Sequence, residues 1–348
     1  MKTNKAVSIL SVAILGLSLL AATAANADAK KVDVNLSNIR TVETHQQFAN
    51  YQKIAGGINK WQHVRQPVAI DKQTTIAMNL DTLYSFAVVD LAKEVTVTMP
   101  EAKGRYMSLQ IITEDHYSPF VFEKPGTYKL TEKNVGTRYA FLAVRTFVNP
   151  HVPKDVDAVH ALQDSIKLVT GSSIPFEIPD YDMNRYHELF GDIQKLIGFW
   201  NGDTRGAMGK KGEVDELLHT VATIAGWGLQ PPENAMYQVV NIGLESDKKY
   251  IVTVPSDVPV KFFWSISIYN AKGYFEKNDL DAYSLNNVTA KKNADGSYTI
   301  RLGAWAKGED NVLPLPAEKG FYHQWRMYGP EKPILEGKWS FSDPVEVK

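Results

Sequence analysis

Residues 79–91, with the sequence NLDTLYSFAVVDL, put polar side chains at the start of a strongly apolar run. A run rich in β-branched and aromatic residues predicts a buried strand. Because successive side chains of a strand point to opposite faces, Asn79, Asp81 and Ser85 share one face and Tyr84 lies on the other. Buried polar groups need partners, so Asp81 and Ser85 either satisfy backbone groups at the strand start or form the floor of a ligand site.

Short apolar strands dominate two parts of the chain, and turn signals rich in Gly, Pro and Asn separate them. The first group is predicted at residues 75–78, 82–91, 95–99, 105–113, 127–130 and 139–148. The second is predicted at 237–242, 250–254, 260–270, 298–302 and 321–328. Strands at this spacing without intervening helices favour antiparallel sandwiches or jelly rolls.

Helical periodicity marks the other segments. Apolar residues recur at steps of three and four over residues 42–58, which end at a glycine pair suited to a helix C-terminus. Between the two strand-rich parts, three further helices are predicted: one from residue 154 that includes Val156, Val159, Leu162, Ile166 and Val169, one beginning at Met183, and one over 214–225. Asp155 is a candidate N-cap for the first of these.

The pattern therefore predicts a mainly β, α+β protein with two antiparallel β-sandwich or jelly-roll-like domains bridged by about three helices. The predicted divisions are a signal peptide at 1–27, an N-terminal β domain with a leading helix at 28–153, a helical linking segment at 154–236, and a C-terminal β domain at 237–348. A mature chain of roughly 320 residues is long enough for two such cores.

The N-terminus has the features of a secretory signal peptide. Lys2 and Lys5 precede an apolar run over residues 6–22, and Ala25-Asn26-Ala27 is a small-x-small cleavage site. We expect cleavage after Ala27 and a soluble periplasmic or secreted protein without a permanent membrane span. The chain has no cysteine, so its stability cannot depend on disulfides.

Composition and motifs exclude several function classes. The formal net charge of −1 lacks the basic excess that nucleic-acid binding favours. The sequence has no Gly-x-Ser-x-Gly elbow, His-Glu-x-x-His helix, Walker loop or dinucleotide fingerprint, and the absence of cysteine excludes cysteine catalysis. No histidine pair has the close helical spacing of a zinc site, so we expect no metal and no cofactor.

Polar residues on the predicted strands define the candidate site. Asp115 and His116 are the acid–base candidates, although regular strand geometry would make them diverge unless a bulge or turn follows Thr113. The alternative is that Asp115 closes a loop and His116 is an exposed strand-end residue. The ligand-binding candidates are Asn79, Asp81, Tyr84, Arg105, Arg145, Trp264, Tyr269 and Arg326.

Arginines flanked by aromatic residues on central strands need a carboxylate or a ligand anion. For Arg145, Asp81 and Asp164 are the possible protein partners, and the same reasoning applies to Arg326. We expect the N-terminal candidates to converge near one end of their domain, with Tyr269 or Arg326 reaching them from the C-terminal domain.

Several motifs also match a known family in order. They are INKWQHVR at 58–65, the segment 79–85, GRYMSLQ at 104–110, FWSISIYN at 263–270, NDL at 278–280, DGS at 295–297, NVLP at 311–314 and RMYGP at 326–330. With these the chain resembles bacterial proteins that combine the domains of unknown function numbers 1254 and 1214. Val312 departs from the pattern, since members often have an aromatic residue there. The resemblance implies the fold and architecture and names no chemistry.

Two classes of function fit these observations. The first is a non-catalytic protein that binds a small molecule in a cleft at or between the β domains, or serves as a structural or interaction protein of the envelope. The second is an extracytoplasmic hydrolase or lyase that uses Asp115 and His116. A homo-oligomer is compatible with both.

Overall fold

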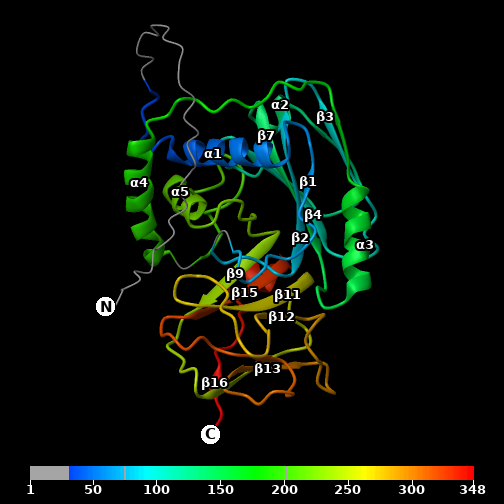
Figure 1. Cartoon of the computed structure of the whole chain (residues 1–348), viewed down its shortest axis with the longest axis vertical. Coiled ribbons are helices and arrows are strands. Elements are labelled where there is room, and N and C mark those ends of the chain that lie inside the picture. The colour runs from blue at the N-terminus through cyan, green and yellow to red at the C-terminus, as the bar shows by residue number, and fades with distance from the viewer. Residues whose placement is uncertain (1–30, 74–75, 201) are drawn as a thin grey trace, which may run out of the picture.

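The computed structural model describes residues 31–73, 76–200 and 202–348. The predicted signal peptide and its cleavage site lie outside these ranges. The predicted fold class is confirmed, because the described chain consists mainly of antiparallel sheets in two β-rich parts with helices between them (Figure 1).

The N-terminal β domain is a sandwich of two antiparallel sheets. The larger sheet has the order β1 (Gln62–His63), β2 (Thr82–Asp90), β7 (Tyr139–Phe147), β4 (Met107–Thr113) and β5 (Phe120–Phe122). The smaller has the order β6 (Gly126–Leu130), β3 (Val95–Met99) and β8 (Lys167–Thr170). Alternate apolar residues of the two sheets, including Val89, Leu142 and Val97, form the core between them.

Helices cover the other face of the larger sheet. Helix α1 (Ile39–Ile54) lies across it, and Phe48 of α1 packs against Phe86 and Phe141 of the strands. Helices α4 (Met183–Leu196) and α5 (Glu216–Ala225) pack beside α1 (Figure 1). Helix α3 (Pro153–Asp164) lies at a different edge of the domain, and the short α2 (Glu132–Val135) follows β6.

The C-terminal domain is a second sandwich. One sheet has the order β12 (Ser284–Asn286), β11 (Val260–Tyr269), β15 (Tyr322–Pro330) and β9 (Ala235–Val240). The other has the order β14 (Val312–Leu313), β13 (Tyr298–Gly303), β10 (Lys249–Val254) and β16 (Val345–Glu346), with β13 and β14 parallel. The first sheet lies next to the N-terminal domain, and β13 and β16 lie farther away (Figure 1). Two short helical elements complete the list, η1 (Ile197–Phe199) and α6 (Lys332–Leu335).

Three local predictions are wrong. The N-cap of α3 is Val152, and Asp155 lies within the first turn of that helix. Residues 76–78 form an irregular connection in place of a strand, since Ala77 has φ 50° and its amide donates to the Gly273 carbonyl. The helix predicted from residue 154 ends at Asp164, and Val169 belongs to β8, which pairs with β3. The segment between the domains thus supplies a strand to the N-terminal sandwich. The sequence pattern did not predict this strand, because four residues are too few to distinguish a strand from the end of a helix.

Candidate ligand site between the domains

The connection that leads into β2 joins the two domains through hydrogen bonds. Asn79 Oδ1 accepts from the Asp81 amide at 2.6 Å, which fixes the turn at the strand start. Asn79 Nδ2 donates to the Tyr328 hydroxyl at 2.7 Å, and Asn286 Nδ2 donates to Asp81 Oδ1 at 2.9 Å. Tyr328 and Asn286 belong to the C-terminal sheet, so the amide and carboxylate at the start of β2 lie at the domain boundary.

Arg326 anchors the C-terminal side of this boundary. Strand register places it beside Ser265 of β11 and Tyr237 of β9, on the sheet face that points away from the C-terminal core. Its Nη2 donates to the Ala77 carbonyl at 2.8 Å and to the Tyr269 hydroxyl at 2.7 Å. The guanidinium group therefore binds the N-terminal domain through the backbone of the connection before β2.

Asp81 is a buried carboxylate with one unpaired oxygen. Its side chain is 1% exposed, and among the described residues Oδ2 has no hydrogen-bond partner. Burial raises the pKa of Asp81, while Ser265, Asn286 and the charge on Arg326 offset only part of that rise. Ser265 lies close enough to act on the pKa, but its hydroxyl does not meet the geometry of a hydrogen bond. An unpaired buried carboxylate oxygen is costly and marks a place where a ligand or a water can bind.

We expect Asp81→Asn to raise the melting temperature at pH 7. A raised pKa in the folded state means that folding favours the protonated form of Asp81. Its contribution to stability is therefore complete below the pKa of the unfolded chain, and it is lost as pH rises through the pKa of the folded protein. The asparagine does not ionise, so the gain over the wild type should appear above pH 4 and vanish in more acidic buffer. Melting temperatures measured across this range test the sign.

Asp155→Asn is the control with the opposite sign. Arg105 holds the pKa of Asp155 below its usual value, so the stability due to this carboxylate is present at neutral pH and lost as pH falls through its folded pKa. The Asp155 variant should therefore melt at a lower temperature at pH 7. A lower melting temperature for Asp81→Asn at pH 7 would contradict the interpretation that the charge on Asp81 is destabilising.

Arg145 is a second buried guanidinium, on the N-terminal side of the boundary. Its Nη1 donates to Gln110 Oε1 and its Nη2 to the Gly228 carbonyl, each at 2.7 Å, and its charge lies 5.4 Å from the centre of the Tyr84 ring. Burial opposes the charge, but nearby tyrosines led by Tyr84 outweigh it and raise the pKa of Arg145. Both acceptors of the Arg145 guanidinium are therefore neutral groups, a side-chain amide and a backbone carbonyl.

Neither expected carboxylate pairs with Arg145. Asp164 hydrogen-bonds to Arg65 and Asp81 to Asn286. Within the part of the chain that the structure describes, no carboxylate forms a salt bridge with Arg145 or Arg326.

Each arginine has a tyrosine beside it on the neighbouring strand. Tyr237 of β9 pairs with Arg326, and Tyr84 of β2 pairs with Arg145. Burial raises the pKa of Tyr237, and the positive charges of Arg145 and Arg326 act to lower it. Tyr84 and Tyr328 contribute two more phenols to the same region. We call Arg145, Arg326, Tyr84, Tyr237 and Tyr328 the arginine–tyrosine layer.

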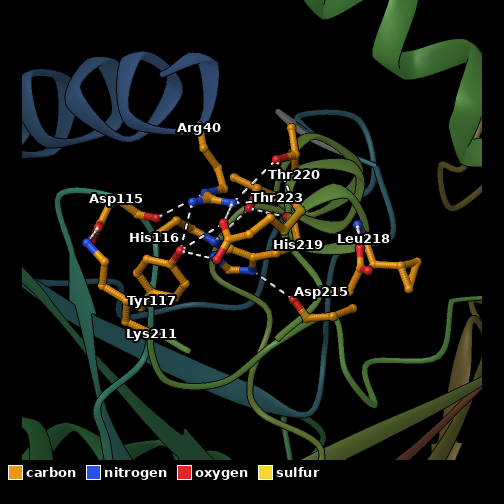
Figure 2. A network of polar contacts seen from close by, with 12 residues as sticks. Arg40, Asp115, His116, Tyr117, Lys211, Asp215, Leu218, His219, Thr220 and Thr223 are labelled. Carbon is orange, nitrogen blue, oxygen red and sulfur yellow. Dashed lines mark hydrogen bonds and ion pairs between the residues drawn. The ribbon is translucent and has the colours of Figure 1, made fainter. Parts of the chain in front are cut away.

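Asp115 and His116 lie in a second network, beside α1 and α5 (Figure 2), and this network meets Arg145 at Gly228. His116 is fully buried in a turn with φ 69°; its Nε2 accepts from the Gly228 amide at 2.9 Å, so the proton on Nδ1 faces Thr223 Oγ1, also at 2.9 Å. Burial, with smaller effects from His219 and Arg40, lowers the pKa of His116 well below its usual value. The ring is a neutral group whose two nitrogens both have protein partners.

The Asp115 carboxylate has its own partners in this network. Its Oδ1 accepts from Thr113 Oγ1 at 2.6 Å, and its Oδ2 lies 3.1 Å from Lys211 Nζ. Arg40 Nε donates to the Asp115 carbonyl at 3.2 Å (Figure 2). The turn at His116 therefore gives the two predicted acid–base residues separate hydrogen-bond partners.

Two further candidates also lie apart from the layer. Arg105 forms a bidentate ion pair with Asp155 of α3, with one arm at 2.9 Å, and supports the end of β7. Trp264 points into the C-terminal core, where its ring lies 5.1 Å from Tyr298 and 5.7 Å from Trp325. Of the eight ligand-binding candidates, the structure gathers Asn79, Asp81, Tyr84, Arg145, Tyr269 and Arg326 at the domain boundary.

Sequence reasoning missed Tyr237, Tyr328, Asn286 and Gln110. Tyr328 has a detectable signal, since it stands two residues after Arg326 and so shares its strand face. Gln110 shares the face of Ser108, which pairs with Arg145. Asn286 follows no such rule, because its position depends on the pairing of the three-residue strand β12.

Residues 31–73, 76–200 and 202–348 contain neither a cluster of metal ligands nor a membrane-spanning helix. No group of three or more His, Asp or Glu side chains is arranged to hold a metal ion. No helix there is long and apolar enough to cross a membrane.

Comparisons with known proteins agree with the architecture. Residues 58–170 match the family described as Protein of unknown function (DUF1254), and residues 240–332 match Protein of unknown function (DUF1214). No curated protein matches the chain.

Two solved structures share the fold. The VPA0106 protein from Vibrio parahaemolyticus is 20% identical with a TM-score of 0.68, over 90% of this chain and 98% of that one. An uncharacterized protein from Burkholderia cenocepacia is 18% identical with a TM-score of 0.51, over 90% and 87% of the two chains. The two family matches, in this order along one chain, show that the protein belongs to the family that combines an N-terminal DUF1254 domain with a C-terminal DUF1214 domain.

Proposed function

We propose that the protein binds a small organic carboxylate in the arginine–tyrosine layer between its two β domains. The observation that carries this proposal is the pair of buried guanidinium groups, one from each domain, that have no salt bridge to a carboxylate among the described residues.

The charge balance of the layer favours an anion. Arginine remains protonated even when it is buried, so Arg145 and Arg326 bring two positive charges into a region of low dielectric. Asp81 is the nearby carboxylate, and its raised pKa weakens its role as a counter-charge. A bound anion would neutralise this excess and accept hydrogen bonds from the guanidinium groups.

The surroundings favour an organic anion over a simple inorganic one. Tyr106, Phe147, Phe263 and Tyr328 form an aromatic cluster at the boundary, with the Phe263 and Tyr328 rings stacked at 4.1 Å. Such rings pack against an apolar body, while the guanidinium fork of Arg145 matches the two oxygens of a carboxylate. Binding without chemistry suits this layer, because burial raises the pKa of Tyr237 and of Tyr328, so both phenols stay protonated at neutral pH and do not act as general bases.

We expect a carboxylate to stabilise the wild type and to lose this effect in Arg145→Gln. Thermal unfolding is measured with acetate, benzoate, succinate and inorganic phosphate as separate probes. A ligand at about 100 times its Kd adds about 2.7 kcal/mol to the free energy of unfolding, which is a readily measured shift. Glutamine keeps a polar group near Gln110 and Gly228 and removes the charge.

Arg185→Gln is the matched control, since Arg185 is an exposed arginine of α4 paired with Glu188 at 3.0 Å. It should retain the full stabilisation by the carboxylate. The proposal fails when no carboxylate stabilises the wild type, or when the same carboxylate stabilises the wild type and Arg145→Gln equally. Stabilisation by phosphate alone would reject the organic carboxylate as the ligand class.

We also propose that the protein is exported and works outside the cytoplasm. The support is the basic start, apolar run and Ala25-Asn26-Ala27 site of the sequence. N-terminal sequencing of the protein from the expressing bacterium should give Asp28 as the first residue, and a chain that still begins at Met1 would reject export by this route.

A further inference from the structure

A cavity of about 630 Å³ lies at one end of the C-terminal sandwich, where the loops that follow β11, β13 and β14 meet. Ile268 and Leu315 line it and also belong to the C-terminal core, so the base of the cavity is apolar. Ile268 points to the opposite face of β11 from Ser267 and Tyr269. The cavity is therefore separate from the arginine–tyrosine layer, and its size suits a small-molecule site.

Trp305 is the largest side chain that lines this cavity, and the structure fixes its position. The indole N–H donates to the Leu302 carbonyl at 3.0 Å and lies 3.2 Å from the Tyr250 carbonyl. The preceding turn requires glycine at position 303, because φ is 95° and a Cβ there would lie 2.0 Å from the Lys248 carbonyl oxygen. Lys249 Nζ and the Arg301 guanidinium lie 5.0 and 5.3 Å from the centre of the ring, so a ligand at Trp305 packs on a ring that is bordered by two cations. A rigid aromatic ring loses little entropy when a ligand packs on it.

A second aromatic residue and two prolines extend the apolar wall. Tyr283 is 8% exposed, and its hydroxyl donates to Asp281 Oδ1 at 2.8 Å, which holds the ring in place. Pro314 and Pro316 line the cavity with flat, rigid rings. The cavity therefore presents several flat apolar surfaces in fixed positions.

The rim carries balanced charges. Glu276 and Asp279 bring two carboxylates, and Lys277 and Lys307 bring two ammonium groups, all on exposed residues that line the cavity. Equal numbers of opposite charges do not favour an ionic ligand of either sign. Carboxylates and ammonium groups do, however, form strong hydrogen bonds with hydroxyl groups.

We infer that this cavity binds a neutral carbohydrate of one or two sugar rings. The apolar C–H face of a sugar packs on aromatic and proline rings, and its hydroxyls reach the charged rim. An uncharged ligand with one apolar face and many hydroxyls matches both parts of the cavity. This site is independent of the anion proposed for the arginine–tyrosine layer.

The test is saturation-transfer NMR on the mature protein with glucose, N-acetylglucosamine, maltose and cellobiose, each up to about 20 mM, a range set for weak millimolar binding. At least one sugar should bind saturably, and Trp305→Ala should weaken that binding by about tenfold or more, equivalent to about 1.4 kcal/mol. Phe199→Ala, which removes a ring that is 90% exposed on η1, should leave it unchanged.

A rim variant covers the case in which Trp305→Ala does not fold. Glu276→Gln combined with Asp279→Asn changes exposed side chains only, and should weaken sugar binding several-fold without altering the melting temperature. Arg145→Gln should bind the sugar as the wild type does, which separates this site from the arginine–tyrosine layer. Absence of saturable sugar binding, or equal binding in the wild type and the cavity variants, would overturn the inference.

Discussion

Replacement of Arg326 by methionine is expected to lower the free energy of unfolding by about 3 to 5 kcal/mol. Arg326 is 3% exposed and its guanidinium donates to Ser267, Tyr269 and the Ala77 carbonyl, so its loss leaves buried acceptors without donors. It also removes the positive charge that acts on Asp81. The damage should lie at the domain boundary, since the Ala77 bond joins the two halves.

Urea unfolding of Arg326→Met against two controls tests this expectation. Arg326→Lys retains the charge near Asp81 but cannot reproduce the fork, so its loss should be intermediate. Arg185→Met removes an exposed arginine and should change stability by no more than about 1 kcal/mol. An Arg326→Met protein as stable as the wild type would show that this residue does not hold the domains together.

The two arginines of the layer are therefore expected to respond differently. Arg326 makes three hydrogen bonds, and the one to the Ala77 carbonyl crosses the domain boundary. The two acceptors of Arg145, Gln110 and Gly228, both precede the C-terminal sheet, which begins at Ala235. Arg145 is the better probe of ligand binding, because its substitution breaks no bond to the C-terminal sheet. Arg326 is the better probe of domain association.

The fold was predictable where the side-chain pattern directly reflects strand geometry. In β11, Trp264, Ile266 and Ile268 point to the core while Ser265 and Ser267 point to the domain boundary, as strict alternation requires. The same rule placed Arg326 on its face of β15. Long strands repeat this signal several times, so they were found with errors of one or two residues at their ends.

Short elements and turns were not predictable in the same way. β8 has four residues, and its Val169 continues by chance the spacing of the preceding helix. His116 adopts a positive φ, which ends the alternation of β4 and turns the ring toward Thr223 and Gly228. These positions depend on contacts with α5 and the segment after it, about a hundred residues later in the chain.

The site followed the same division. Asn79, Asp81, Tyr269 and Arg326 were correctly predicted to lie near one another at the domain boundary. All four are at the ends or on the polar faces of long strands, where alternation predicts the direction of each side chain. Arg105 had a partner that no pattern in its own strand reveals, since Asp155 belongs to α3. Pairing across distant elements is set by tertiary packing.

Trp325, the neighbour of Arg326 on β15, is expected to show the contrast between the two faces of this strand. Replacement by alanine should lower the free energy of unfolding by about 3 to 5 kcal/mol, because the side chain is 0% exposed and its removal leaves a large cavity. Its ring stacks on Phe341 at 3.8 Å and lies 5.7 Å from Trp264, so the neighbouring strand β11 and the segment before β16 lose contacts.

Trp325→Phe separates packing from polarity at this position. Among the described residues the Trp325 indole N–H has no hydrogen-bond partner, so phenylalanine removes an unpaired buried donor while it keeps a ring against Phe341. Its loss of stability should be less than half that of Trp325→Ala in urea unfolding. The carboxylate that binds in the arginine–tyrosine layer should still stabilise Trp325→Phe, because Trp325 points away from that layer, and equal losses in the two variants would contradict this account of the core.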